Sequence, residues 1–153
     1  MLKFGFGFVE CGTLTPRPQA GNPRPRLFRL SEDGAVINRM GFNNGGMVRA
    51  AAKLSRRKRA GIVGINIGAN KDSADRMADY RECFVRLAPL ADFITINISS
   101  PNTPGLRGLQ NRDELERLLG LITDTRAQMS AAVPLLLKIA PDLDSHALDD
   151  IAA

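Results

Sequence analysis

Amides, hydroxyls and turn residues are concentrated in one short stretch, residues 97–107 (NISSPNTPGLR). It follows the apolar, β-branched residues 93–96, which are typical of a buried strand. Two prolines and a glycine fix the loop and leave its polar side chains able to contact a ligand. A turn whose side chains bond only to its own backbone is the alternative. The density of donors and acceptors favours a binding site.

Four apolar runs end in, or are followed by, a residue that could do chemistry: Thr13, Asn66, Asn97 and Lys138. The carboxyl ends of parallel strands lie at one edge of a sheet, where barrels and open α/β sheets keep their active sites. We therefore expect the four side chains to converge. An ammonium group at the end of an apolar strand also needs an anionic or electron-rich partner, which makes Lys138 the most informative of them. Each residue alone could be a strand-end group bonded to backbone, but the four together favour a ligand site.

The elements that would position these residues alternate along the chain. Strands are predicted over residues 6–11, 62–65, 93–96 and 135–139, a hairpin over 27–37, and helices over 46–58, 73–87 and 111–129, with a last helix after Asp144. Asn111 and Glu114 have the spacing of a capping box. This alternation predicts an α/β fold with a parallel sheet and right-handed crossovers. Without a linker or an internal repeat, residues 1–153 are expected to form a single domain.

Composition excludes several classes of protein. The 153 residues are 44% hydrophobic and 24% charged, which is ordinary for a soluble globular domain. No apolar run approaches the length of a membrane span. Cys11 and Cys83 lack a metal or redox spacing, so reduced thiols in the core are expected. His146 is the single histidine, which excludes a multi-histidine metal site, and no metal is expected.

The net charge of +5 raises nucleic acid as a possible partner. The excess is local, however, and comes from Lys53, Arg56, Arg57, Lys58 and Arg59. No aromatic residue is interleaved there to stack on bases. A solvated helix end, where the helix dipole favours cations, is the preferred interpretation. A small basic nucleic-acid-binding protein remains the alternative.

The strings GTLTPRPQ, INRMGFNN, GINIGAN, NISSPNTPGLR and KIAPDL, in this order, resemble those of the quinone-linked, class 2 dihydroorotate dehydrogenases. The resemblance covers essentially the whole chain. That family is a (β/α)8 barrel that uses FMN to oxidise dihydroorotate to orotate, the fourth step of pyrimidine (UMP) synthesis, with a quinone as electron acceptor. The resemblance implies an α/β fold, a partial TIM barrel of about four parallel strands, resembling the second to the fifth, with crossover helices and a β-hairpin excursion.

The resemblance also implies an internal segment, residues 1–153, forming one partial FMN-binding barrel domain. The family's quinone-binding, membrane-associated helices, its early glycine and lysine loop and its later phosphate-binding strands are not expected in these residues. The full-length family would lie peripherally on the cytoplasmic side of the bacterial cell membrane, without a nucleic-acid partner. A non-catalytic barrel fragment or pseudoenzyme is the alternative.

The same resemblance implies roles for individual residues. Thr13, Asn66, Asn97 and Lys138 would contact FMN. Lys138 would lie near N1 and C2 of the flavin, where a cation stabilises the negative charge of the reduced ring.

For the substrate, the resemblance implies a second set of residues that would hold or adjoin dihydroorotate: Asn38, Arg39, Met40, Gly41, Phe42, Asn97 and Asn102. Ser100 would be the catalytic base that takes the C5 proton while hydride passes from C6 to flavin N5. The class 1 enzymes carry cysteine there, so the serine assigns the class. A serine hydroxyl is a poor base and needs a dry site with a proton relay. Thr103 and Phe42 resemble the residues that line such a relay.

Overall fold

The computed structural model describes residues 1–58, 60–102, 105–129 and 132–153. Within them a parallel sheet has the strand order β1-β4-β5-β6. The strands of this sheet are β1 (Phe8–Leu14), β4 (Ile62–Ile67), β5 (Phe93–Asn97) and β6 (Leu135–Lys138). A separate antiparallel pair consists of β2 (Leu27–Leu30) and β3 (Ala35–Asn38). The helices are α1 (Gly46–Leu54), α2 (Arg76–Leu87), α3 (Arg112–Gln128) and α4 (Ser145–Ala152), with short 3-10 turns η1 (Leu2–Phe4), η2 (Ala88–Leu90) and η3 (Leu106–Gln110).

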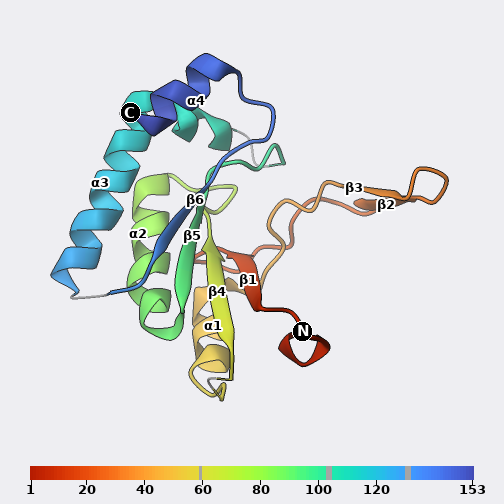
Figure 1. Cartoon of the computed structure of the whole chain (residues 1–153), viewed down its shortest axis with the longest axis horizontal. Coiled ribbons are helices and arrows are strands. Elements are labelled where there is room, and N and C mark those ends of the chain that lie inside the picture. The colour runs from red at the N-terminus through yellow and green to blue at the C-terminus, as the bar shows by residue number, and fades with distance from the viewer. Residues whose placement is uncertain (59, 103–104, 130–131) are drawn as a thin grey trace.

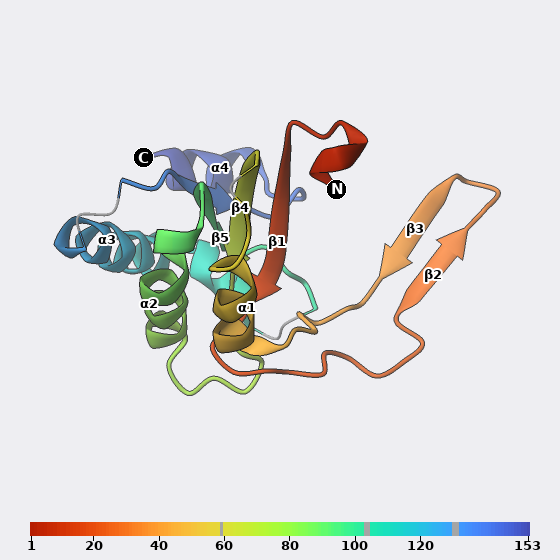
Figure 2. The ribbon, with the colours of Figure 1, turned by 90° about the horizontal axis from the view of Figure 1, so that it is seen from below.

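Helices α1, α2 and α3 lie on the same side of the sheet (Figure 1, Figure 2). Successive residues of a strand point to opposite faces, so every second residue of β4 and β5 faces these helices. The core forms there, and its fully buried side chains include Ile65, Ile67, Ile94, Ile96, Tyr80, Phe84, Leu87, Leu118 and Ile122. The intervening strand residues point to the opposite, open face of the sheet.

Large apolar side chains stand exposed on that open face. Phe8, Ile62 and Leu136 have exposed fractions of 61%, 51% and 50%. The sheet also has two unpaired edges among the described residues, β1 and β6. A parallel sheet with helices outside and an open inner face is part of a (β/α)8 barrel, which confirms the fold class predicted from the sequence.

Gly64 makes room for an aromatic pair on the open face. A Cβ atom built on Gly64 would lie 2.0 Å from Cζ of Phe93. The Phe93 ring meets the ring of Phe8 edge-on, with 5.7 Å between the ring centroids. Any side chain at Gly64 must therefore displace the ring that joins β5 to β1.

We expect Gly64→Ala to destabilise the complete encoded protein by about 1–3 kcal/mol, because the new methyl group overpacks the Phe93 ring. Denaturant unfolding measures the change. Gly120→Ala, in the interior of α3, is the matched control. A Cβ atom there meets nothing within 4 Å among the described residues, so alanine should stabilise by about 0.5–1 kcal/mol. Equal changes in both variants would contradict the packing argument.

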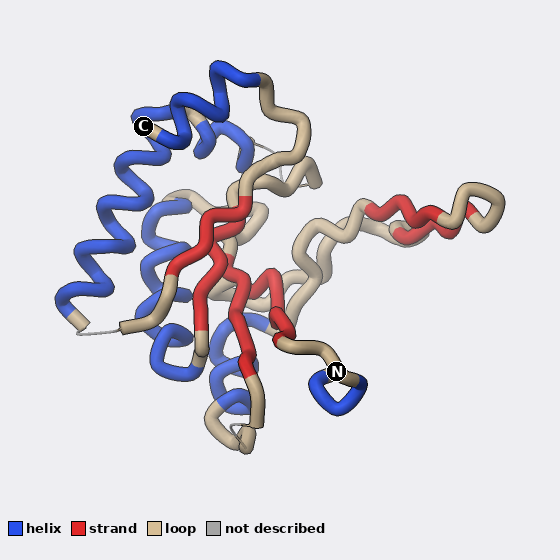
Figure 3. Tube along the Cα trace, in the orientation of Figure 1, coloured by secondary structure: helices blue, strands red, loops and turns tan. Residues whose placement is uncertain are grey.

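The β2–β3 hairpin projects away from the sheet (Figure 3). All residues of both strands are exposed. Its base is closed by an antiparallel bridge between Gln19 and Asn44, whose backbone N–H groups each donate to the other's carbonyl oxygen, at 3.1 and 3.0 Å. The Arg39 guanidinium also donates to the carbonyl oxygen of Pro25, at 2.8 and 3.0 Å. The hairpin predicted from the sequence is confirmed.

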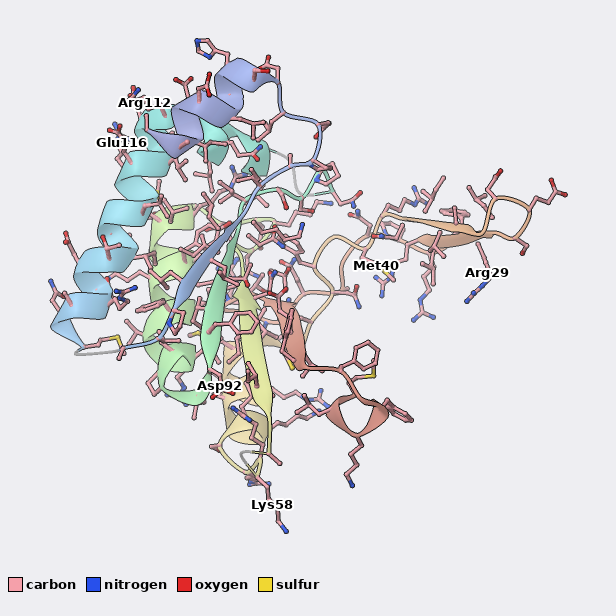
Figure 4. All side chains as sticks on the ribbon, viewed as in Figure 1. Arg29, Met40, Lys58, Asp92, Arg112 and Glu116 are labelled. Carbon is pink, nitrogen blue, oxygen red and sulfur yellow. The ribbon has the colours of Figure 1, made fainter. Side chains whose placement is uncertain are left out.

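Several predicted boundaries are wrong by a few residues. β1 runs from Phe8 to Leu14 rather than over 6–11, so Thr13 lies within the strand. α1 ends at Leu54 rather than at residue 58. Beyond that helix Arg57 lies in a turn, and its guanidinium pairs with the Asp92 carboxylate at 2.8 Å, anchoring the turn to the start of β5. Figure 4 shows Lys58 beyond it, pointing away from the molecule.

Helix caps also differ from the predictions. α2 begins at Arg76 rather than at residue 73, because the Asp75 carboxylate accepts a hydrogen bond from the N–H of Ala78 at 3.0 Å. Asn111 is the N-cap of α3, but within the described contacts its side chain makes no capping bond, so the capping box is wrong. Glu114 accepts from Arg117 instead, at 3.1 Å. Asp144 caps α4 through the N–H of Ala147, as predicted.

The two cysteines have different surroundings. Cys83 is buried in the core, and burial raises the pKa of its thiol. Cys11 is exposed on the edge strand β1, so the prediction that it belongs to the core is wrong. Its strand has no partner on that side among the described residues. In the described part of the chain, no helix is both long and apolar enough to cross a membrane.

Candidate functional site

Three of the four predicted strand-end residues meet directly at the carboxyl end of the sheet. The Thr13 hydroxyl donates to Asn66 Oδ1 at 2.7 Å. Asn97 Nδ2 donates both to Thr13 Oγ1, at 3.0 Å, and to Asn66 Oδ1, at 3.1 Å. The residues come from β1, β4 and β5, which lie side by side. The convergence expected from the sequence is therefore present in the structure.

Lys138 joins this cluster through Ser99, a residue that the sequence analysis did not select. The Lys138 Nζ donates to Ser99 Oγ at 2.8 Å. The Ser99 hydroxyl donates to Asn97 Oδ1 at 3.0 Å, and the backbone N–H of Ser99 donates to the same oxygen at 3.2 Å. Ser99 is 3% exposed. The cation that ends β6 is thus held over the end of β5.

Glu10 and Thr95 extend the cluster toward the middle of the sheet, and the sequence analysis missed both. Glu10 Oε1 accepts from Asn66 Nδ2 at 2.8 Å. Its second oxygen, Oε2, accepts from the Thr95 hydroxyl at 2.5 Å. A carboxylate only accepts hydrogen bonds, so it determines which end of the Asn66 amide faces it.

Tyr80 of α2 fixes the end of β5 from the helical side. Its hydroxyl donates to the backbone carbonyl oxygen of Asn97 at 2.6 Å. Burial raises the pKa of Tyr80, which keeps the hydroxyl protonated as a donor. The backbone of Asn97 is therefore held by a buried side chain of the core, while its own side chain makes hydrogen bonds within the polar cluster.

Asn70 organises the loops that follow β1 and β4. This residue is 1% exposed. Its Oδ1 accepts from the N–H of Arg17 at 3.0 Å, and its Nδ2 donates to Thr15 Oγ1 at 3.2 Å and to Gln19 Oε1 at 2.8 Å. The Asp79 carboxylate accepts from the Asn70 backbone N–H at 2.8 Å. The chain after β1 is thereby tied to α2.

Asn44 holds the predicted substrate loop in place by hydrogen bonds to the chain after β1 and to the start of α1. Its Nδ2 donates to Thr15 Oγ1 at 2.8 Å and to the Phe42 carbonyl oxygen at 2.7 Å. Its Oδ1 accepts from the N–H of Gly46, the first residue of α1, at 2.8 Å. Phe42 has a φ of 54°, in the left-handed region that few side chains adopt. The Asn44 bond to its carbonyl oxygen helps to hold that conformation.

The predicted substrate residues at 38–42 do not all lie together. Phe42 packs against the core, and a Cβ atom on Gly68 would lie 3.0 Å from its ring and 2.8 Å from the Thr13 methyl group. Gly68 thus allows Phe42 to approach Thr13. Gly41 is buried, and its carbonyl oxygen accepts from Gln19 Nε2 at 3.0 Å. Phe42 therefore borders the cluster, whereas Gly41 lies against Gln19.

Asn38, Arg39 and Met40 instead belong to the base of the hairpin. Asn38 is the last residue of β3, and its Oδ1 accepts from the N–H of Met40 at 3.4 Å. Met40, labelled in Figure 4, lies near the base of the hairpin. It lines a hollow of about 600 Å³ together with Arg24, Pro25, Arg26 and Leu27. Arg39 bonds to this part of the chain through Pro25. None of the three has a described side-chain hydrogen bond to the strand-end cluster.

Ser100 and Asn102 lie in the loop that follows β5. The Ser100 hydroxyl oxygen accepts from the N–H of Asn102 at 3.3 Å. Both side chains are partly exposed. The predicted relay residue Thr103 lies outside the described residues. The described contacts of Ser100 are separate from the Thr13, Asn66, Asn97 and Lys138 cluster.

A polar cluster at the carboxyl ends of parallel strands is the arrangement of (β/α)8-barrel proteins. Residues 1–153 match the family model described as dihydroorotate dehydrogenase. The chain belongs to the dihydroorotate dehydrogenase family, and the resemblance noted in the sequence is confirmed.

Relatives and solved structures agree with this assignment. A protein of Sphingopyxis alaskensis named dihydroorotate dehydrogenase (quinone) is 62% identical over 156 residues, covering 100% of this chain and 44% of the relative. One of Chelativorans sp. with the same name is 60% identical, covering 99% of this chain and 43% of the relative. The crystal structure of DHODH in complex with ferulenol from Eimeria tenella has a TM-score of 0.89 at 41% identity, covering 99% of this chain and 47% of that one. The chain therefore spans less than half the length of these relatives.

Proposed function

We propose that this chain provides flavin- and substrate-binding elements of an FMN-dependent enzyme that oxidises dihydroorotate to orotate in pyrimidine synthesis. The main support for this proposal is the continuous set of side-chain hydrogen bonds at the carboxyl edge of the sheet, which joins Thr13, Asn66, Asn97, Ser99 and Lys138. Membership of the family supports the reaction. We also propose that residues 1–153 act as one FMN-binding barrel domain.

The side chains present fit the flavin chemically. The pyrimidine edge of an isoalloxazine ring carries carbonyl oxygens and an N–H group. The amides of Asn66 and Asn97 and the Thr13 hydroxyl offer both donors and acceptors. Lys138 adds a cation on the open face, and a cation there favours negative charge on the ring. These residues would hold the flavin, which when bound supplies the hydride acceptor.

The remaining steps belong to residues of the chain. In the proposal Ser100 takes the proton from C5 of dihydroorotate, and Asn97 and Asn102 orient the substrate with the residues at 38–42. A serine hydroxyl stays protonated near neutral pH, so it needs a neighbouring group that accepts its proton and a site that excludes water. Thr103 is proposed for this relay, and Phe42 is proposed to line it. Phe42, packed against the core beside Gly68, could exclude water there.

Quinone as electron acceptor is proposed because the relatives described above are named dihydroorotate dehydrogenase (quinone). A peripheral position on the cytoplasmic side of the cell membrane is part of the same proposal. The proposal includes no nucleic-acid partner, and Arg57, one of the basic residues after α1, pairs with Asp92.

The test is to purify the complete encoded protein and measure three properties in turn. Flavin released by heating should be FMN, dihydroorotate should reduce the bound flavin without oxygen, and a soluble quinone should then reoxidise it. Orotate, which cannot be oxidised further in this reaction, is the matched control and should perturb the flavin spectrum without reducing it. A colourless protein that takes up no FMN would contradict the proposal and favour a non-catalytic barrel fragment.

A further inference from the structure

Glu10 occupies a position that none of the proposed roles uses. The register pairs it with Gly64 of β4, and Gly64 in turn pairs with Phe93 of β5. Glu10 therefore belongs to the open face of the sheet. Its carboxylate bonds to Asn66 on β4 and to Thr95 on β5, although β4 separates β1 from β5. One side chain thus connects three adjacent strands.

From Lys138 to Glu10 the hydrogen bonds run head to tail. Lys138 Nζ donates to Ser99 Oγ at 2.8 Å, and the Ser99 hydroxyl donates to Asn97 Oδ1 at 3.0 Å. Asn97 Nδ2 donates to Asn66 Oδ1 at 3.1 Å, and Asn66 Nδ2 donates to Glu10 Oε1 at 2.8 Å. The chain of bonds begins at a cation, ends at an anion and crosses all strands of the described sheet.

Each charged end determines the direction of the hydrogen bond that it makes. An ammonium group can only donate, and an ionised carboxylate can only accept, whereas a side-chain amide fits either way round. Because Glu10 accepts, Asn66 must present its NH2 group to it and leave Oδ1 for Asn97. Asn97 is oriented independently, because its Oδ1 accepts from the backbone N–H of Ser99, and it presents its NH2 group to that Asn66 oxygen. Hydrogen bonds arranged head to tail also polarise and strengthen one another.

Building on the proposed function, we propose that Glu10 is a positioning residue that fixes the orientation of the Asn66 amide. It thereby determines which of the two amide atoms of Asn66 the site offers to the flavin. Glu10 acts through this amide and needs no contact with the flavin or the substrate.

Glu10→Gln in the complete encoded protein tests this proposal. Glutamine keeps the size of the side chain but adds an NH2 group, so it no longer enforces one orientation of Asn66. We expect the dissociation constant of FMN to rise about tenfold, the order of effect of one charge-assisted hydrogen bond. Titration of the flavin-free protein, followed by flavin fluorescence, measures this constant. The visible absorption band of the bound flavin should also shift, since its hydrogen-bond partners change.

Two further variants separate orientation from other effects. Glu116→Gln makes the same chemical change on the exposed side of α3, beside Arg112 (Figure 4), and should leave the constant within about twofold of the parent. Thr95→Val removes the hydrogen bond from Thr95 to Glu10 Oε2 but leaves the hydrogen bond from Asn66 to Glu10 Oε1 in place. The dissociation constant of FMN should therefore rise less than about threefold. If Thr95→Val weakens FMN binding as much as Glu10→Gln, Glu10 merely ties strands together and the proposal is wrong.

A readout that needs no flavin distinguishes this proposal from the proposed function. With asparagine labelled by 15N, the side-chain amide protons of Asn66 and Asn97 should exchange slowly with solvent. Asn66→Asp identifies the Asn66 signal by its loss. Glu10→Gln should shift the Asn66 signal and speed its exchange, and Glu116→Gln should not. A protein that fails to bind FMN would refute the proposed function, whereas an unmoved Asn66 signal in Glu10→Gln would refute the role of Glu10.

Discussion

Replacing Ser100 by alanine in the complete encoded protein is expected to slow flavin reduction by dihydroorotate about 100- to 10,000-fold while FMN stays bound. The physical reason is that the proposed function gives the hydroxyl the proton transfer, and its described contact is with the Asn102 backbone rather than with the strand-end cluster. Stopped-flow absorbance of the flavin without oxygen measures the rate.

The neighbouring serine is the matched control for this prediction. Ser99→Ala removes the hydroxyl that lies between Lys138 and Asn97, so it should weaken FMN binding more than it slows proton transfer. The two variants are thus expected to differ: Ser100→Ala should mainly slow flavin reduction, and Ser99→Ala should mainly weaken FMN binding. A Ser100→Ala rate within about threefold of the parent would remove Ser100 as the base, because general-base loss is far larger.

Lys138→Ala should weaken FMN binding about 10- to 100-fold, the range that loss of a charged hydrogen-bonding group predicts. It should also lower the flavin reduction potential. In the proposed site the cation would favour the negatively charged reduced ring over the oxidised one, so its removal would make reduction harder. Spectroelectrochemical titration measures the potential, and fluorescence titration measures the binding.

Lys58→Ala is the control for the lost charge. Lys58 follows α1 and points away from the molecule (Figure 4), so its removal should leave both the potential and the FMN affinity unchanged. An unchanged potential in Lys138→Ala would show that the ammonium group supports the fold through Ser99 instead of acting on the flavin.

The meeting of Thr13, Asn66 and Asn97 was predictable because it depends on the common direction of neighbouring parallel strands. Parallel strands bring their carboxyl ends to one edge, so polar residues at those ends must gather there. The helical layer was predictable for a similar reason, since buried isoleucines at alternate strand positions require a covering surface.

Glu10, Thr95 and Ser99 were missed because their roles depend on register, which a single sequence does not reveal. A partial signal existed in β5, where Thr95 and Asn97 occupy alternate positions between isoleucines and must share a face. Nothing in the sequence shows that Glu10 lies opposite Gly64, and that alignment brings its carboxylate to Asn66 and Thr95. Hydrogen bonding across strands therefore had to come from the structure.

The bridge between Gln19 and Asn44 has a consequence for the entropy of the unfolded chain. It closes the excursion that carries β2 and β3 at its own base, and further backbone bonds join Asn22 to Met40 and Arg39 to Arg26. Once these local contacts form, the path from β1 to α1 is effectively short. The cost of closing a loop grows only by about 0.6 kcal/mol for each doubling of its length. The sheet can therefore accommodate longer or shorter versions of this excursion with little change in its own stability.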